Sequence, residues 1–152
     1  MQEIERKFLV NTKKWKPTGN GIDLKQGYLS IDPERTVRIR IAGNKAFLTI
    51  KGKSKGISRT ELEYNIPVDE AEVLMAMCLD FVIEKTRYLE KKQELVWEID
   101  IFHGNNEDLV LAEVELKNVN QHVDLPEWIE KEVSNDKRYF NSWLSQHSFK
   151  TW

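Results

Sequence analysis

The chain has 152 residues, of which 23 are Lys or Arg and 25 are Asp or Glu, giving a formal net charge of -2. This near balance argues against a general nucleic-acid binder, which would carry a basic surplus. The single cysteine, Cys78, excludes an internal disulfide, and no apolar stretch approaches the length of a membrane-spanning helix. We therefore expect a cytoplasmic protein with no nucleic-acid or membrane partner and one domain over residues 1–152.

The first two-thirds of the chain predicts short strands separated by turn signals, beginning with "MQEIERKFLV". Strands are expected over residues 1–10, 22–30, 35–42, 45–53, 57–68, 82–92, 94–102 and 109–118, with a tight hairpin at Ala42–Lys45. Apolar residues at helical spacing predict one helix over residues 69–80, which Asp69 can cap. Two further helices are expected over residues 126–134 and 137–149. The fold class is therefore mainly β (α+β), with eight strands and a helical C-terminus.

Charged residues occupy one face of seven of these eight strands, because side chains at i and i+2 share a face. In order along the chain they are Glu3, Glu5, Lys7, Arg38, Arg40, Lys51, Arg59, Glu61, Glu63, Lys85, Arg87, Glu98, Asp100, Glu113, Glu115 and Lys117. For a single strand the simplest interpretation is a solvated outer face. The repetition, and the abundance of Glu, which does not favour strands, argue for another arrangement.

An eight-stranded antiparallel sheet tends to curl, and closing it removes its exposed edges. We predict a closed barrel whose charged face lines a tunnel and whose apolar exterior is covered by packed helices. Buried charges need partners, and the set contains eight acids and eight bases. Arg and Lys bind phosphoryl oxygens, whereas carboxylates bind Mg²⁺ or Mn²⁺. The composition of this face suits a polyphosphate chain that arrives with divalent cations.

The sequence resembles the triphosphate tunnel metalloenzymes, also called the CYTH superfamily. The resemblance begins with the "ExExK" motif formed by Glu3, Glu5 and Lys7. It continues through "VRIR", "LTIKG", "RTELEY", "EKTRY", "WEIDIF" and "AEVEL", in this order, and is greatest to the small bacterial members that hydrolyse inorganic triphosphate. It implies an eight-stranded tunnel barrel and metal-dependent cleavage of a triphosphate, with one or two Mg²⁺ or Mn²⁺ ions.

The resemblance also implies roles for the charged residues. The metal ligands would be Glu3, Glu5 and Glu115, with Glu113 close by. The triphosphate would be bound by Lys7, Arg38, Arg40, Lys51, Arg59, Lys85 and Arg87. Glu61, Glu63, Glu98 and Asp100 match acidic tunnel positions, some of which would hold a second metal or, as we expect of Glu63, orient water. Lys85 is our candidate for stabilising or protonating the leaving phosphate, although Arg87 and Lys51 could serve as well.

Several alternatives remain open at this point. The same family contains adenylyl cyclases and thiamine triphosphatases, and a non-catalytic polyphosphate-binding module would use the same bases. An outer-membrane barrel also points apolar side chains outward, but Arg6, Glu84 and Thr86 on the outer face argue against it. An apolar barrel exterior would allow a homodimer.

Overall fold

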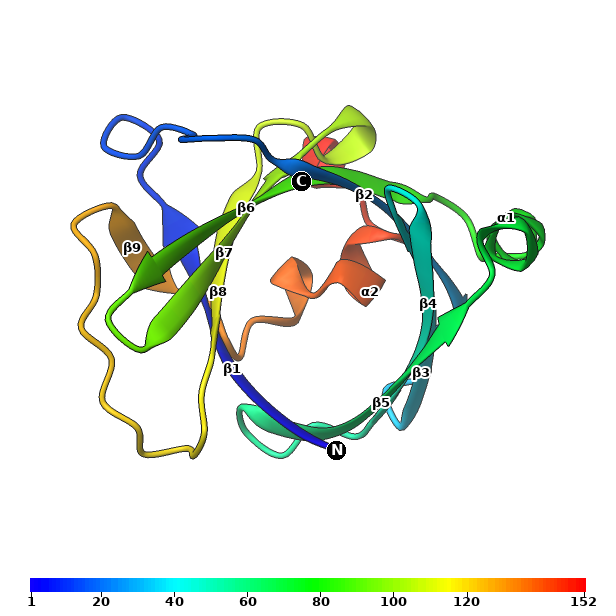
Figure 1. Cartoon of the computed structure of the whole chain (residues 1–152), viewed down its shortest axis with the longest axis horizontal. Helices are drawn as coiled ribbons and strands as arrows, with labels where there is room; N and C mark the ends of the chain where they lie inside the picture. The colour runs from blue at the N-terminus through cyan, green and yellow to red at the C-terminus, as the bar shows by residue number, and fades with distance from the viewer.

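The computed structural model describes residues 1–152, and its main feature is a nine-stranded antiparallel sheet (Figure 1). The strands are β1 (Gln2–Val10), β2 (Ile22–Ser30), β3 (Arg35–Ala42), β4 (Lys45–Gly52), β5 (Ser58–Ile66), β6 (Ile83–Lys92), β7 (Leu95–Phe102), β8 (Val110–Glu115) and β9 (Ile129–Glu132). The helices are α1 (Val68–Ala76) and α2 (Asn141–Leu144), with 3₁₀ turns η1 (Gly104–Asn106), η2 (Lys137–Tyr139) and η3 (Phe149–Thr151). The first eight strands confirm the predicted set. None of the helices has the length and apolarity needed to cross a membrane.

The sheet closes into a barrel through β1, which pairs with β8 along one edge and with β5 along the other. The pairing with β5 involves only Gln2, Glu3 and Ile4 of β1. Further along β1, the short strand β9 takes the place of β5 and pairs with Phe8 and Val10. The strand order around the ring is therefore β1, β8, β7, β6, β2, β3, β4, β5, and the predicted closed eight-stranded barrel is confirmed.

The helix predicted over residues 126–134 is wrong, because residues 129–132 form strand β9. The second half of β1 lies beyond the end of β5, so its backbone groups on that edge would lack hydrogen-bond partners without β9. On the outer surface Arg6 fixes this pairing through two hydrogen bonds to the Glu132 carboxylate, of 2.6 and 3.0 Å. Hydrogen bonding to the distant strand β1 therefore outweighs the local preference of residues 129–132 for a helix.

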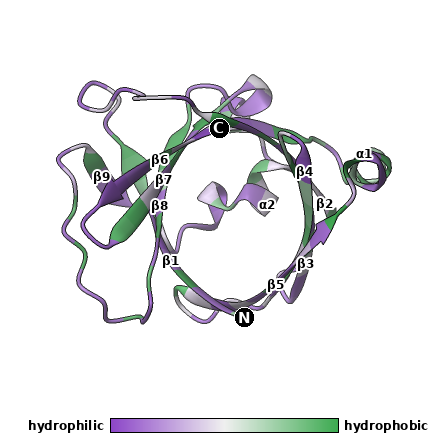
Figure 2. Cartoon of the chain, in the orientation of Figure 1, coloured by the Kyte–Doolittle hydropathy of each residue, from purple (hydrophilic) through white to green (hydrophobic).

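The outer face of the wall is apolar, as predicted, and polar and apolar residues alternate along the ring (Figure 2). The largest buried cluster surrounds Trp97 of β7, which is fully buried and packs against Phe8 of β1 and against Trp128. Trp15 packs on Trp128 at a ring-centroid distance of 6.3 Å. Since Trp15 and Trp128 lie outside the barrel strands, the chain covers this part of its exterior with its own loops and β9.

Helix α1 packs outside the barrel against β2, β3 and β4, where Ala71 and Met75 are buried against Ile39 and Ala46. The helix and the turn after it approach closely because residue 27 is Gly: a Cβ there would lie 3.1 Å from the Sδ atom of Met75 and 2.8 Å from the Sγ atom of Cys78. This is the predicted position for a helix covering an apolar wall.

The C-terminal helical segment behaves differently from α1, because it lies within the ring when the barrel is viewed end-on (Figure 1). The predicted helix over residues 137–149 is divided into η2 and the four-residue α2, and Phe149 begins η3. Leu144 of α2 is fully buried among Tyr28, Ile83 and Phe102, whose side chains line one end of the barrel interior. The segment is thus broken into short turns, and individual residues such as Leu144 pack into the barrel. It closes one end of the tunnel.

Candidate functional site

The barrel interior contains a cavity with a free volume of about 90 Å³, and charged side chains form most of its wall. Ten of the fifteen predicted site residues line it: Glu3, Glu5, Lys7, Arg38, Arg40, Lys51, Arg59, Lys85, Arg87 and Glu113. Alternation along the strands places these side chains inside, because their neighbours at odd spacing form the apolar exterior. The structure therefore brings together residues from six strands, β1, β3, β4, β5, β6 and β8.

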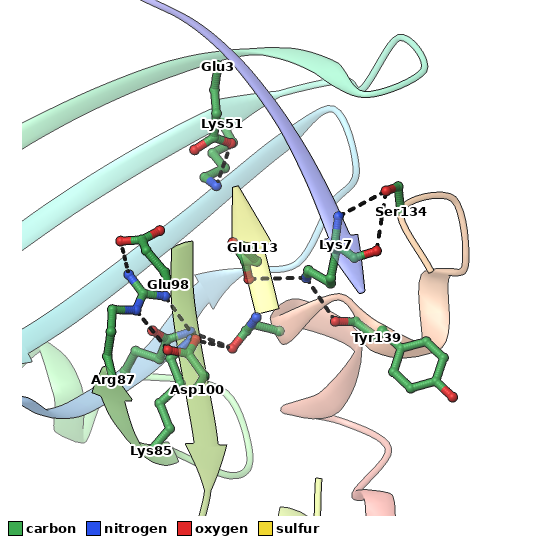
Figure 3. Close-up of polar contacts among 12 residues, drawn as sticks. Glu3, Lys7, Lys51, Lys85, Arg87, Glu98, Asp100, Glu113, Ser134 and Tyr139 are labelled. Atoms are coloured by element: carbon green, nitrogen blue, oxygen red, sulfur yellow. Dashed lines mark hydrogen bonds and ion pairs between the residues drawn. The ribbon is translucent and has the colours of Figure 1, made fainter. Parts of the chain in front are cut away.

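Two lysines of the cavity pair with carboxylates near β1. The Lys51 Nζ atom lies 2.9 Å from Glu3 (Figure 3). It also lies 3.3 Å from Glu61. The Lys7 Nζ atom lies 3.6 Å from Glu113 and also donates a 3.0 Å hydrogen bond to the Tyr139 carbonyl. Lys7 is therefore shared between the barrel wall and the C-terminal segment.

A buried ion-pair network lies deeper, around Asp100, which is 1% exposed (Figure 3). Its carboxylate lies 2.8 Å from the Lys85 Nζ atom and accepts two hydrogen bonds from Arg87, of 2.8 and 2.9 Å. Arg87 also pairs with Glu98 at 3.0 Å. Asp100 and Glu98 thus serve the bases of β6 and do not line the cavity themselves.

Burial and ion pairing shift the pKa values of this network in different directions. Burial opposes ionisation of Asp100, but Lys85 and Arg87 outweigh it and lower the pKa of Asp100 to about 2. Burial lowers the pKa of Lys85 to about 7 in spite of the attraction of Asp100, and the nearby Arg87 and Arg40 add to the shift. Burial therefore makes the Lys85 amine a weaker base than an ordinary lysine.

Arg40 is a buried site base without an acidic partner. It makes no ion pair, and its guanidinium donates only to the Gln26 Oε1 atom, at 3.0 and 2.9 Å. Burial, with repulsion from Arg38 and Arg87, lowers the pKa of Arg40 to about 10. The Arg38 Nε atom is buried without a hydrogen-bond partner, and Arg59 bonds only to the Gly52 carbonyl and the Thr36 hydroxyl. Arg38 has one acidic contact, at 3.7 Å from Glu63, whereas Arg40 and Arg59 have none, so positive charge is left unmatched at the cavity wall.

Glu5 presents the opposite imbalance on the facing part of the wall. Its carboxyl group forms no ion pair, and burial, followed by repulsion from Glu113 and Glu3, raises its pKa well above its usual range. Burial also opposes ionisation of Glu113, but Lys7, Arg87 and Lys85 lower its pKa. A carboxylate in this position needs either a proton or a cation. The cluster of Glu3, Glu5 and Glu113 therefore offers the hard oxygen donors that suit a divalent cation, although no three ligands are already assembled for one.

The remaining predicted acids, Glu61, Glu63 and Glu115, do not line the cavity. Glu61 contacts Lys51, as described above. Glu63 accepts a 3.1 Å hydrogen bond from Thr49 and lies 3.7 Å from Arg38. Glu115 is exposed, although its backbone is directly opposite Glu5 in the β1–β8 pairing. The structure does not gather all eight predicted metal carboxylates around one point.

Sequence reasoning missed several polar residues of the site. Asn141 of α2 accepts hydrogen bonds from the Lys85 Nζ atom at 2.9 Å and from the Gln26 Nε2 atom at 3.0 Å. Because Gln26 also accepts from Arg40, this amide pair connects Arg40 with Lys85. Gln26 and Tyr28 share the inward face of β2, so strand alternation could have identified them. Asn141 had no comparable signal, because it lies in a segment that enters the barrel from outside the ring.

Residues 1–142 match the CYTH domain. The chain is 45% identical over 150 residues to the inorganic triphosphatase of Acetivibrio thermocellus, covering 98% of this chain and 96% of the relative. It is 38% identical to the inorganic triphosphatase of Nitrosomonas europaea over 95% of this chain and 97% of that protein. The crystal structure of an inorganic triphosphatase superposes with a TM-score of 0.66 at 36% identity, covering 94% of this chain and 93% of the other.

Proposed function

The chain belongs to the CYTH domain family, and from this premise we propose that it is a divalent-metal-dependent triphosphatase that cleaves the terminal phosphoanhydride of inorganic triphosphate. Two relatives similar over almost their whole length are inorganic triphosphatases, which favours hydrolysis over an adenylyl cyclase, a thiamine triphosphatase or a non-catalytic polyphosphate-binding module. A cytoplasmic location and a homodimer stay predictions.

The observation that carries the proposal is that one narrow cavity contains both unmatched positive and unmatched negative charge. Arg40 has no acidic partner, and Glu5 has no basic one. A simple anion would satisfy only the arginines, and a cation alone would satisfy only the glutamates. A triphosphate with a bound divalent cation satisfies both, so binding would remove two electrostatic penalties together.

The carboxylates best placed to hold the cation are Glu3, Glu5 and Glu113, since all three line the cavity. The ion would be Mg²⁺ or Mn²⁺, and a second ion would draw on Glu61 or Glu115 at the margin. When bound, such a cation offsets charge on the phosphoryl oxygens as the bridging bond breaks. The sequence also predicts Glu63, Glu98 and Asp100 as metal ligands. In the proposed site they instead hold basic side chains in place through ion pairs, Glu63 with Arg38, Glu98 with Arg87, and Asp100 with Lys85.

The bases would hold the triphosphate along the cavity. Arg38, Arg40 and Arg59 have free or weakly used donors, which fit phosphoryl oxygens through paired hydrogen bonds. Lys7, Lys51 and Arg87 would exchange part of their contacts with carboxylates for contacts with phosphate. Positioning and electrostatic stabilisation of this kind provide most of the catalysis in phosphoryl transfer.

Lys85 would transfer the proton. Its pKa of about 7 allows the amine to be protonated before the reaction and neutral after donating to the leaving phosphate oxygen. Asp100 and Asn141 hold the amine in place through contacts of 2.8 and 2.9 Å. Glu63, which we predict to orient water, would act from the margin of the cavity next to Thr49.

The direct test measures phosphate release by the purified protein with Mg²⁺ or Mn²⁺ from inorganic triphosphate, ATP, thiamine triphosphate and long-chain polyphosphate. We expect the highest kcat/KM with inorganic triphosphate. If the protein binds triphosphate tightly but releases no phosphate from any substrate, it is a polyphosphate-binding module and the proposed hydrolysis is refuted.

Two substitutions test the proposed roles of Arg40 in binding the triphosphate and of Glu5 in binding the cation. Arg40→Gln should lower kcat/KM roughly 10- to 100-fold, the usual effect of losing a hydrogen bond to a charged group. Arg35→Gln on the same strand is the matched control, because Arg35 is exposed and pairs with Asp32 and Glu34. Glu5→Gln should weaken activation by the cation, whereas Glu130→Gln, at an exposed residue of β9, should not. Equal effects of Arg40→Gln and Arg35→Gln would remove Arg40 from the site.

A further inference from the structure

Residues 140–142 of the C-terminal segment line the tunnel cavity together with the charged side chains of the barrel. The segment is held there by Leu144, which is fully buried, and by Lys7, which donates a 3.0 Å hydrogen bond to the Tyr139 carbonyl. Among residues 140–142, only Asn141 forms side-chain hydrogen bonds with the barrel strands. An amide side chain thus lies among the bases at the closed end of the tunnel.

The amide of Asn141 has one orientation, which follows from the contacts that lead to it. Arg40 has only donors, so the Gln26 atom that faces it, at 2.9 and 3.0 Å, is the Oε1 acceptor. The other end of the Gln26 amide is the Nε2 donor, and the Asn141 atom 3.0 Å away from it is therefore the Oδ1 acceptor. The same Oδ1 atom accepts a hydrogen bond from the Lys85 Nζ atom at 2.9 Å. Both contacts use Oδ1, which leaves the Nδ2 group of Asn141 without either partner.

The Nδ2 group of Asn141 is a free donor in the cavity wall. It makes no hydrogen bond within the protein, and Asn141 is half-buried where it lines the tunnel. An amide NH₂ group donates only, so it cannot bind a cation, and the Oδ1 atom, which could, already accepts from two donors. The ligand atom that suits this group is a hydrogen-bond acceptor, such as a phosphoryl oxygen.

We propose that Asn141 is a substrate-binding residue, whose Nδ2 group donates a hydrogen bond to a phosphoryl oxygen at the closed end of the tunnel. This inference rests on the proposed function, because it takes the tunnel to be the triphosphate site. Gln26 is completely buried and does not line the cavity, so it does not touch the substrate. It is a positioning residue, because its contact with Arg40 fixes its own amide and thereby the amide of Asn141.

Asn141→Asp separates the proposed contact from the support that Asn141 gives to Lys85. An aspartate keeps an oxygen for Lys85 and for Gln26 but replaces the Nδ2 donor by a second oxygen. The probe is the non-hydrolysable diimido analogue of triphosphate, in which NH replaces both bridging oxygens, titrated calorimetrically with Mg²⁺. We expect its binding to weaken at least roughly 10-fold, because a hydrogen bond to a charged group contributes about 10- to 100-fold and repulsion adds to the loss. If Asn141 only holds Lys85, the affinity should stay that of the wild type.

Two variants control for the added charge. Asn135→Asp is the same substitution at an exposed residue before η2 that does not line the tunnel, and it should change the affinity less than twofold. Asn141→Ala adds no charge and should weaken the analogue roughly 10- to 100-fold. The melting temperature of each variant, measured without the analogue, shows that it is folded.

The side-chain NH₂ signal of Asn141 reports the contact directly. In protein labelled with ¹⁵N at asparagine, this signal is identified by its loss in Asn141→Ala, and it should shift when the analogue is added. The NH₂ signal of Asn106 is the reference, because its side chain is buried outside the cavity and accepts a hydrogen bond from the Phe149 backbone. It should not shift.

A double-mutant cycle tests the positioning role of Gln26. Gln26→Met removes its contacts with both Arg40 and Asn141. If Gln26 orients Asn141, Gln26→Met should weaken the analogue at least about twofold less in the Asn141→Ala background than in the wild type, because residues of one hydrogen-bond network are coupled. Equal weakening in both backgrounds would show that Gln26 acts through Arg40 alone.

The outcomes distinguish this inference from the proposed function. Wild-type affinity in Asn141→Asp, or an Asn141 NH₂ signal that the analogue does not move, overturns the contact. A wild type that does not bind the analogue overturns both. If inorganic triphosphate is not hydrolysed but binding of the analogue still depends on Asn141, the proposed function fails and the contact stands.

Discussion

Asp100 is the residue whose removal most directly tests the electrostatics of the barrel. Its side chain is almost completely buried, and it compensates both Lys85 and Arg87. Asp100→Asn keeps the shape but removes the charge, so it leaves Lys85 without an acidic partner and Arg87 with Glu98 alone, beside the already unmatched Arg40. Breaking a buried ion pair in this way costs about 3–5 kcal/mol. At about 2–4 °C per kcal/mol for a chain of this size, we expect the melting temperature to fall by roughly 6–20 °C.

The pH dependence of unfolding gives an independent measure. The pKa of Asp100 is lowered from 3.8 to about 2, so the ionised carboxylate stabilises the fold above pH 4. This contribution is lost as the pH falls towards 2, because the folded protein then takes up the proton at a lower pH than the unfolded chain. A shift of nearly two units corresponds to about 2 kcal/mol. Urea unfolding between pH 7 and pH 2 should show the gap between wild type and Asp100→Asn narrowing by that amount.

Asp136→Asn is the matched control for this experiment, because Asp136 also pairs with an arginine, Arg138, at 2.7 Å. That pair lies at the surface, where an ion pair contributes at most about 1 kcal/mol. We expect Asp136→Asn to unfold close to the wild type. If Asp100→Asn costs no more than Asp136→Asn, the buried network around Lys85 is not electrostatically coupled as described.

Three further predictions concern the C-terminal segment and Lys85. Leu144→Ala should lower the free energy of unfolding by about 2–5 kcal/mol in urea titrations, because Leu144 is fully buried inside the barrel, whereas the 41% exposed Leu79 should tolerate Ala far better. Asn141→Ala should lower kcat while the protein stays folded, and it should shift the pH–rate profile, because Lys85 and Gln26 lose their shared hydrogen-bond acceptor. An unchanged profile would make the role of Asn141 towards Lys85 purely structural. Between pH 7 and 10, the free energy of unfolding of the wild type should rise relative to that of Lys85→Met. In this range Lys85 binds a proton in the unfolded chain but has released it in the folded protein, where its pKa is about 7. If the free energies of unfolding of the two proteins run parallel with pH, burial does not lower the pKa of this amine.

The barrel and its charged lining could be predicted from sequence because both follow from strand alternation. In β3, for example, Arg38 and Arg40 point inward while Ile39 between them is fully buried in the outer layer. Such a pattern of period two is local, and closure of the sheet repeats it on every strand. Ten of the fifteen predicted site residues consequently line one cavity.

The segments after β8 could not be predicted in the same way, because their structure is set by contacts distant in sequence. Ile129–Glu132 is extended because it fills the free edge of β1, and Asn141 occupies its position because Lys85 and Gln26 bind its amide oxygen. Alternation also could not show which inward acids remain unpaired. Asp100 and Glu5 look equivalent in sequence, but two bases contact Asp100 and none contacts Glu5.

This difference between Asp100 and Glu5 separates the stabilising charges of the barrel from those available to a ligand. A fully paired interior would be more stable, yet a ligand entering it would have to break as many contacts as it formed. Arg40 and Glu5 carry a free-energy penalty, because each is partly buried without a counter-charge. A metal–triphosphate complex would remove that penalty while the Asp100 network keeps Lys85 and Arg87 in place. The residues that lower the stability of the barrel are therefore those that we expect to contribute most to binding.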